Sequence, residues 1–294
     1  METKLQTSHL SQNYAFFLSF SSFIGTFFFF GIFMPFYRTL WLSILIGGAL
    51  VWLILTIAAP KKHWLPPRLL ALLAITYGGL SLWAFFVFCQ RYLFPNHGFW
   101  FFPLCFILVT AYGSHLGIAA LERTSKFSSV SIMILLVLTT LSMIQKLSTQ
   151  KDFLLEISTS LLQLDIHSFF KETALVTLFL LCQALILTAF CDFNLSKAPS
   201  DMIHSIRKAS VSSILFSSAL QLLGVLALGP HAYEYLTYPI YDMLSLPGMA
   251  EYLDRTEFLM LVIFLFCESV KTIVFFLAGR HLFAGRTHKK IHTA

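Results

Sequence analysis

The chain has 294 residues, of which 57% are hydrophobic and only 12% are charged. Soluble domains contain about 25% charged residues, so this composition excludes an ordinary soluble enzyme or binding module. Runs of 18 or more apolar residues recur, and each can cross a hydrocarbon core about 30 Å thick. The net charge of +6 requires no nucleic-acid partner, because basic loops facing anionic lipid account for it. The sequence therefore predicts an all-α integral membrane protein whose main partner is the lipid bilayer.

The apolar runs predict about eight transmembrane helices in a single membrane domain, residues 1–294. In chain order, the expected spans are 14–34, 39–59, 69–89, 99–121, 127–145, 172–191, 209–229 and 257–279. Most of the ten prolines fall between the spans, where helices are expected to break. The run 99–121 contains the polar and glycine-rich stretch AYGSHLG. It is therefore either one bent helix or a span followed by a short interfacial turn.

Lysine and arginine are unevenly distributed between the alternate loops. If the N-terminus is cytoplasmic, 13 of these residues fall on the inner side and 6 on the outer side. Positive residues favour the cytoplasmic side of a membrane, so we expect both termini in the cytoplasm. Two outer loops are long. Residues 152–170 have a helical apolar period typical of a helix lying on the membrane surface, and residues 230–256 are expected to form an ordered cap.

Motifs for metal, cofactor or covalent chemistry are missing. The five cysteines are odd in number and lack C-x-x-C spacing, so neither a disulfide framework nor a zinc site is indicated. His115 is the one histidine inside an expected span, so the facing histidine pairs needed for haem are absent. No H-E-x-x-H, catalytic-triad or phosphate-loop pattern occurs. We expect no enzyme activity, no metal and no cofactor.

Polar residues interrupt two of the expected spans. The first contains SFSSFIGTFFFF, with Gly25 and Thr26 inside a phenylalanine-rich run, and the sixth carries Gln183 at mid-depth. In transporters, helices interrupted at matching points of two repeats expose backbone groups to a ligand near the midplane. A single glycine in a membrane helix also serves ordinary close packing. Both interpretations of Gly25 remain open.

The last expected span contains two charges, Glu268 and Lys271. Each charge at a bilayer centre costs on the order of 2.5–3.5 kcal/mol or more. Because the residues are three apart, they share one helix face and partly neutralise each other. A static structural pair, a Lys271 side chain that snorkels to the interface, and a polar pathway or subunit contact are the alternatives.

Several motifs, in this order and spacing, resemble the spore-germination permease family, the B-type subunit of nutrient germinant receptors. They are LALGP (226–230), YPIYDMLSLP (238–247) and YLDRTEFLMLVIFLFCESVKTIVFF (252–276), with FLSFSSFIGTFFFF (17–30) and AYGSHLGIAALERTSKF (111–127) upstream. Arg123, Arg255, Glu257 and Lys271 fall on the charged positions of the family motifs.

The resemblance implies a place in the amino acid–polyamine–cation transporter superfamily. The implied fold is a truncated LeuT-like bundle, with one five-helix repeat and three helices of an inverted second repeat. The implied function is sensing small nutrients such as amino acids during spore germination. The implied setting is the inner membrane of a bacterial spore, beside A-type and C-type receptor subunits. An amino-acid transporter of the same superfamily, or a structural subunit without a ligand site, are the alternatives.

Two positions depart from the family pattern. Phe27 stands where a second glycine is usual, and Gln183 stands where a glutamate is usual. We expect Gly25, Thr26, Phe27 and Gln183 to line a small-ligand pocket, with the bulk of Phe27 restricting its size. Arg255, Glu257, Glu268 and Lys271 are expected to be structural or pathway charges.

Overall fold

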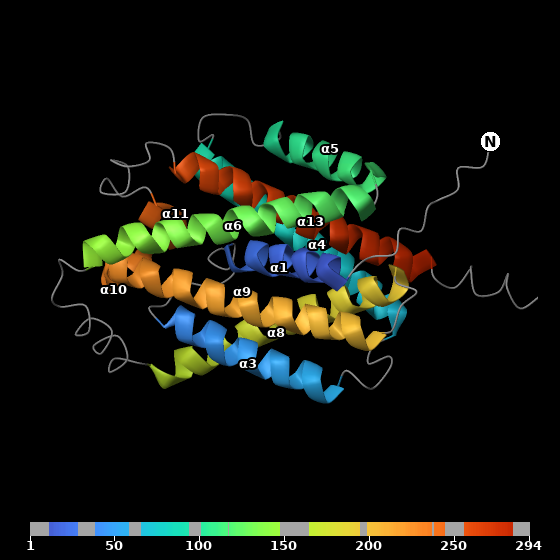
Figure 1. Ribbon diagram of the computed structural model, residues 1–294, viewed down its shortest axis with the longest axis horizontal. Helices are drawn as coiled ribbons and strands as arrows, with labels where there is room; N and C mark the ends of the chain where they lie inside the picture. Colours follow the sequence, from blue (N-terminus) through green and yellow to red (C-terminus); the bar gives the residue numbers. More distant parts are fainter. Residues whose placement is uncertain are drawn as a thin grey trace, which may run out of the picture.

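The computed structural model describes residues 12–28, 39–58, 66–93, 101–116, 118–147, 165–194, 199–236, 238–244 and 256–284. Every regular element in these ranges is a helix, and none is a strand (Figure 1). The long helices are α1 (Gln12–Phe28), α3 (Leu40–Ala58), α4 (Pro67–Phe88), α5 (Phe101–Leu116), α6 (Ile118–Leu147), α8 (Ile166–Asn194), α9 (Pro199–Leu228) and α13 (Thr256–Ala284). The short elements are the π-helical η1 (Cys89–Leu93), α10 (Pro230–Tyr235) and α11 (Pro239–Leu244).

Four of the described helices are long and apolar enough to cross a membrane. They contain Leu40–Ile57, Pro67–Arg91, Ile166–Cys191 and Ile203–Leu228. Tyr14–Phe27 and Phe106–Leu116 are shorter apolar helices. The fold is therefore that of an all-α membrane protein, as its composition predicts. The count of eight spans stays a prediction.

Three expected helix starts differ from the structure by six residues or more, and the largest difference is at α9, which is expected at 209 and begins at Pro199. The helix expected at 127 begins at Ile118, so the charged segment around Arg123 is helical rather than a loop. Its first turns are rich in alanine, leucine and glutamate, which are strong helix formers. The helix expected at 172 begins at Ile166. Residues 166–170, the last part of the predicted surface helix, therefore belong to α8, and residues 152–164 lie outside the described residues.

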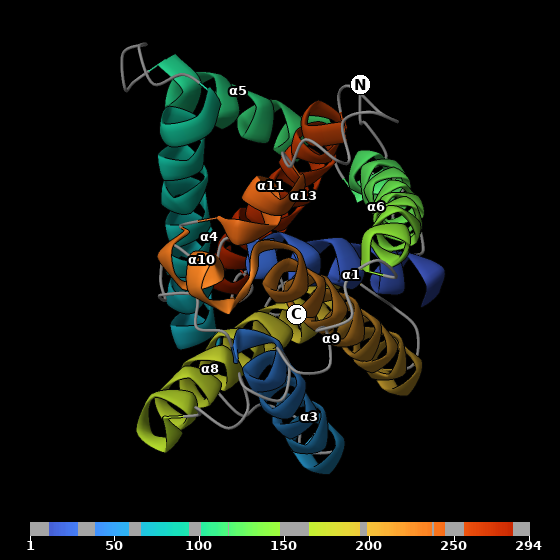
Figure 2. The same ribbon diagram turned by 90° about the vertical axis from the view of Figure 1, so that its left-hand side faces the viewer.

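Helix α3 packs into the angle between α8 and α9 (Figure 2). The adjacent residues Gly47 and Gly48 allow this close packing, because Gly47 faces α8 and Gly48 faces α9. A Cβ atom on Gly47 would lie 2.9 Å from Oγ1 of Thr177 in α8. A Cβ atom on Gly48 would lie 2.6 Å from Ile214 in α9. Small residues at such contacts are how membrane helices achieve close van der Waals packing.

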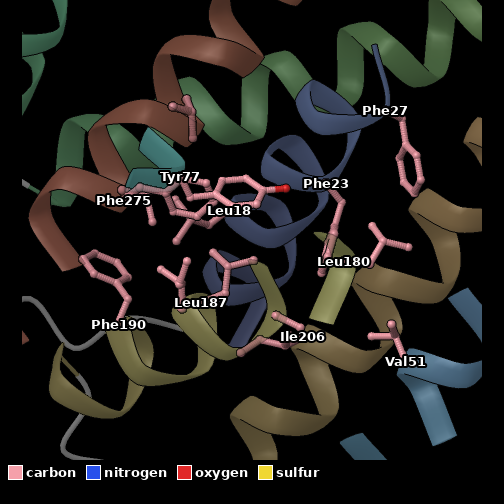
Figure 3. Close-up of a cluster of buried hydrophobic side chains, with 14 of the residues drawn as sticks. Leu18, Phe23, Phe27, Val51, Tyr77, Leu180, Leu187, Phe190, Ile206 and Phe275 are labelled. Carbon is pink, nitrogen blue, oxygen red and sulfur yellow. The ribbon is translucent and has the colours of Figure 1, made fainter. Parts of the chain in front are cut away.

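Helix α1 lies in the interior of the bundle, against α6, α9 and α13. Its apolar side chains enter a cluster supplied also by α3, α4, α8, α9 and α13 (Figure 3). Leu18, Phe23 and Phe27 are each no more than 2% exposed. The buried part of α1 is not purely apolar, since the polar residues Ser19, Ser21, Ser22 and Thr26 are also buried. Polar groups on α1 must therefore find partners inside the protein.

The segment after α9 forms the ordered start of the expected outer cap. Gly229 has φ of +81°, a conformation that favours glycine, and it redirects the chain before Pro230 opens α10. Tyr233 of α10 is fully buried and donates a hydrogen bond to Oε1 of Gln221 in α9. This bond fixes α10 against α9. Residues 245–255 of the expected cap lie outside the described residues.

Candidate functional site

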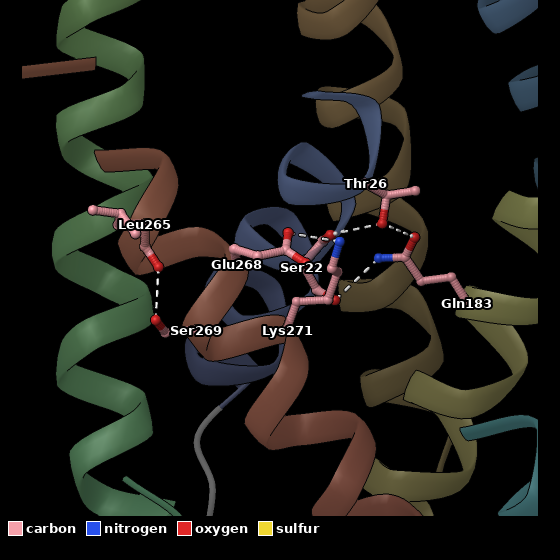
Figure 4. A network of polar contacts seen from close by, with 7 residues as sticks. All are labelled: Ser22, Thr26, Gln183, Leu265, Glu268, Ser269 and Lys271. Atoms are coloured by element: carbon pink, nitrogen blue, oxygen red, sulfur yellow. Dashed lines mark hydrogen bonds and ion pairs between the residues drawn. The ribbon is translucent and has the colours of Figure 1, made fainter. Parts of the chain in front are cut away.

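A hydrogen-bonded network joins the second half of α1 to the middle of α8. Thr26 donates from Oγ1 to Oε1 of Gln183 at 2.8 Å, and Gln183 donates from Nε2 to Oγ of Ser22 at 3.0 Å (Figure 4). Gln183 and Ser22 are fully buried, and Thr26 is 5% exposed. The structure thus brings together two residues that the sequence predicts for one site, Thr26 and Gln183. Ser22, which the sequence pattern did not single out, completes the network.

A buried ion pair lies on α13 beside α1. Nζ of Lys271 is 2.7 Å from Oε2 of Glu268, and both side chains are no more than 2% exposed. Lys271 therefore does not snorkel to an interface. Removing two charges from water costs several kcal/mol per ion in proteins, and their mutual attraction offsets that cost only when the pair stays together. The fold consequently has to hold Glu268 and Lys271 in contact.

Gly25 connects the network with the ion pair. A Cβ atom on Gly25 would lie 3.1 Å from Oε2 of Glu268 and 3.5 Å from the backbone of Cys267. Helix α1 is continuous from Gln12 to Phe28, so the helix break considered for Gly25 is not present. The glycine serves the close approach of α1 and α13 instead. Helix α8 is likewise continuous through Gln183.

Phe27 lies on a different face of α1 and does not join the network. It lines a small apolar cavity with about 10 Å³ for the centre of a water-sized molecule. The other lining residues are Ile24, Phe216, Ser217, Leu220, Ile240 and Phe264. About one water is the most such a volume holds. The expectation that Phe27 shares a pocket with Gln183 is therefore not met in this arrangement of the helices.

Two further charges are expected from the sequence, Arg255 and Glu257. Arg255 lies outside the described residues. Glu257 is the second residue of α13. It precedes Glu268 by eleven positions, a separation of about 16 Å along the helix axis. The structure therefore gives no link between these two residues and the ion pair.

A second polar contact, made by serines, fastens α1 to α6. Oγ of Ser21 is 2.8 Å from Oγ of both Ser128 and Ser129, and it donates to the carbonyl oxygen of Ser125 at 3.0 Å. Ser129 in turn donates to the carbonyl oxygen of Phe17 at 3.2 Å. These hydroxyls are buried and pair with one another across the interface, so the contact positions α1 without offering a free group to a ligand.

In the part of the chain that the structure describes, no three His, Cys, Asp or Glu side chains gather in one place. One buried acid was missed by the sequence interpretation. The sequence places Glu172 at the first position of its span, but in the structure it lies in the second turn of α8 and is 2% exposed. The signal that could have found it is the helical spacing of the apolar residues just before it, Ile166, Phe169 and Phe170.

Apolar helices that enclose a buried ion pair and a buried hydrogen-bonded network define an integral membrane protein with a polar interior, and such interiors mark functional sites in membranes. Comparison with known families makes the assignment specific. The family model described as spore germination protein matches residues 69–289. The match covers most of the chain, which therefore belongs to this family of spore germination proteins, and the resemblance in the motifs is confirmed. Neither the curated proteins nor the solved structures contain a match to the chain.

The matched range contains Gln183, Glu268 and Lys271. Helix α1, with Gly25 and Thr26, precedes it. The part of the chain that matches the family therefore includes the ion pair and the α8 side of the network. The contribution of α1 to the candidate site comes from the geometry alone.

Proposed function

We propose that this protein is the membrane subunit of a spore germinant receptor that senses a small nutrient, such as an amino acid, and triggers germination. Its family supports a membrane protein that acts in spore germination. We further propose that it crosses the inner spore membrane several times, with both termini in the cytoplasm and with A-type and C-type subunits as partners. The distribution of 13 inner and 6 outer basic residues supports this orientation.

The observation that carries the proposal is the meeting of two opposite charges and a neutral polar network at one place in the bundle. An amino acid carries an ammonium and a carboxylate. Glu268 can accept from the ammonium, and Lys271 can donate to the carboxylate, so each charge of the ligand replaces one partner of the pair. Gln183 and Thr26 can donate and accept hydrogen bonds, which suits a neutral polar side chain.

This chemistry also supplies a signal. In the structure Glu268 and Lys271 form an ion pair at 2.7 Å. Helices α1 and α13 are in close contact at Gly25. A ligand that binds both charges has to separate them and move α1 from α13. Ligand binding shifts a protein between two arrangements only when it has different affinity for them. The ligand would bind more tightly to the arrangement in which Glu268 and Lys271 are separated, because only there can both charges contact it.

The test removes hydroxyls from the network without adding charge. Thr26→Val and Ser22→Ala should each shift the nutrient dose response of germinating spores to higher concentration. A net hydrogen-bond contribution of about 0.5–1.5 kcal/mol corresponds to a shift of about 2- to 12-fold. The control is Thr56→Val, since Thr56 is exposed and its hydroxyl donates to the carbonyl oxygen of Trp52 in its own helix. If the network variants match the control at equal protein level, the ligand does not bind here.

The structural-subunit alternative also has an observation in its favour. Both polar atoms of the Gln183 amide already have protein partners, as expected for a group that only holds α8 to α1. In that case Thr26→Val should lower the amount of protein, or of its partner subunits, without altering the nutrient concentration that gives half-maximal germination.

A further inference from the structure

A second buried polar cluster lies between α3 and α8. Oε2 of Glu172 accepts hydrogen bonds from Oγ of Ser43 at 3.0 Å and from Oγ1 of Thr39 at 3.4 Å. Thr173 donates from Oγ1 to Oγ of Ser43 at 3.3 Å. All four side chains are buried, with exposed fractions of 7% or less. The cluster is distinct from the central network, because Glu172 precedes Gln183 by eleven residues, about 16 Å along α8.

The other carboxyl oxygen of Glu172 has no hydrogen-bond partner among the described residues. None of the described basic side chains forms an ion pair with Glu172 either, and the adjacent Lys171 is exposed. Tyr233 lies near enough to interact electrostatically, but burial and the nearby Glu172 raise its pKa well above the usual value. It therefore stays a neutral phenol and supplies no compensating charge.

A buried carboxyl group in this setting either takes up a proton or gains a positive partner. A proton on Oε1 would convert an unpaired acceptor into an unpaired donor, and the buried polar atom would remain unsatisfied. The positive end of the α3 helix dipole also favours the ionised carboxylate, because Thr39 and Ser43 stand at the start of α3. A bound cation satisfies both the charge and the free oxygen.

We propose that Glu172, Ser43 and Thr39 form a binding site for a monovalent cation, with sodium as the fitting ion. The available groups are all oxygens, which hard cations prefer. One carboxylate balances one positive charge, whereas divalent sites in proteins use more carboxylates. One turn after Ser43 the two helices are in close contact, because a Cβ atom on Gly47 would lie 2.9 Å from Thr177 and 3.3 Å from the carbonyl oxygen of Thr173.

The position of the cluster gives a sodium ion a short route. The first turns of α3 and α8 lie at the same end of the bundle as α10 (Figure 1). Glu172 is six residues from the start of α8, a depth of about 9 Å along the helix axis. Along these helices, an ion from the compartment at that end therefore has a short distance to cover. This site is independent of the nutrient site proposed above.

The experiment measures thermal unfolding of the purified full chain in detergent, with sodium chloride replaced by choline chloride at constant ionic strength. Binding to the native state raises the melting temperature in a saturable way, and we expect a rise of several degrees in sodium. Glu172→Gln should abolish the rise, and Ser43→Ala should require several-fold more sodium for the half-maximal effect. Glu122→Gln in α6 is the matched control and should retain the full response.

Direct binding of ²²Na⁺ to the immobilised protein keeps the test decisive if Glu172→Gln does not fold. Wild type should retain the isotope, and Ser43→Ala and Thr39→Val should retain less at equal folded protein. Equal melting temperatures in sodium and choline would overturn the proposal. So would stabilisation by acid alone, which would mean that a proton is the occupant, or an undiminished sodium response in Glu172→Gln.

Discussion

Gly25 of α1 and Glu268 of α13 lie so close that a Cβ atom on Gly25 would be 3.1 Å from the carboxylate oxygen Oε2. The same oxygen is 2.7 Å from Nζ of Lys271. The lack of a side chain at Gly25 therefore allows α1 to lie this close to the ion pair. Any motion of α1 relative to α13 changes the surroundings of a buried charge, where small displacements have large electrostatic effects.

Gly25→Ala should destabilise the protein and weaken the nutrient response. The added methyl group pushes on Glu268, and overpacking of a filled interior costs about 1–3 kcal/mol. Gly25→Leu should have a larger effect in the same direction. The measurements are the melting temperature of the purified protein and the germination dose response at matched protein level.

Gly79→Ala is the matched control for this series, because a Cβ atom on Gly79 would meet nothing within 4 Å. It should leave both measurements unchanged or slightly raise the stability, since alanine favours the helix over glycine. A dose response for Gly25→Leu equal to that of Gly79→Ala would remove the contact of α1 with the ion pair from the sensing mechanism.

Lys271→Met alone should leave Glu268 without its cation. Breaking one side of a buried pair destabilises a protein by about 3–5 kcal/mol, because the remaining charge stays buried. Adding Glu268→Gln should restore part of the protein level and of the melting temperature. The double-mutant cycle measures this coupling, and a double variant no better than Lys271→Met would show that the two residues are not energetically coupled.

The sequence predicts the elements of this site better than their arrangement. A charge in the middle of a span is so costly that Glu268 and Lys271 can be recognised from the sequence as candidate site residues. Gln183 can be recognised in the same way, because it is a polar residue among apolar ones. The role of Gly25 could not be decided, since a glycine is compatible both with a helix break and with close packing. Only the position of α13 shows that packing applies here.

The boundaries of helices at the membrane surface were the least predictable part of the fold. Hydropathy marks where a segment leaves the hydrocarbon, but a helix continues beyond that level as long as its residues favour helix. This is why α6 includes the charged residues around Arg123, and why α8 begins before Glu172. Hydropathy places Glu172 at the edge of a span, but for this reason the residue lies inside the bundle.

Gly48→Leu should separate α3 from α9. A Cβ atom at this position would lie 2.6 to 2.7 Å from three side-chain atoms of Ile214, and the side chains of packed helices cannot absorb such overlap without strain. We expect a loss of stability of about 1–3 kcal/mol for Gly48→Ala and a larger loss for Gly48→Leu. Combining Gly48→Ala with Ile214→Ala should recover part of the melting temperature. No recovery would mean that Ile214 is not the limiting neighbour.

The proposed topology predicts which positions a membrane-impermeant thiol reagent reaches from outside. Single cysteines at Asn96 and Tyr241 should be labelled in intact cells, whereas cysteines at Lys62 and Thr287 should be labelled only after the membrane is opened. The reason is the excess of lysine and arginine on the inner side, 13 against 6. The native cysteines have to be replaced first, although Cys89, Cys191 and Cys267 are buried and should react slowly. Labelling of Thr287→Cys from outside would overturn the arrangement with both termini in the cytoplasm.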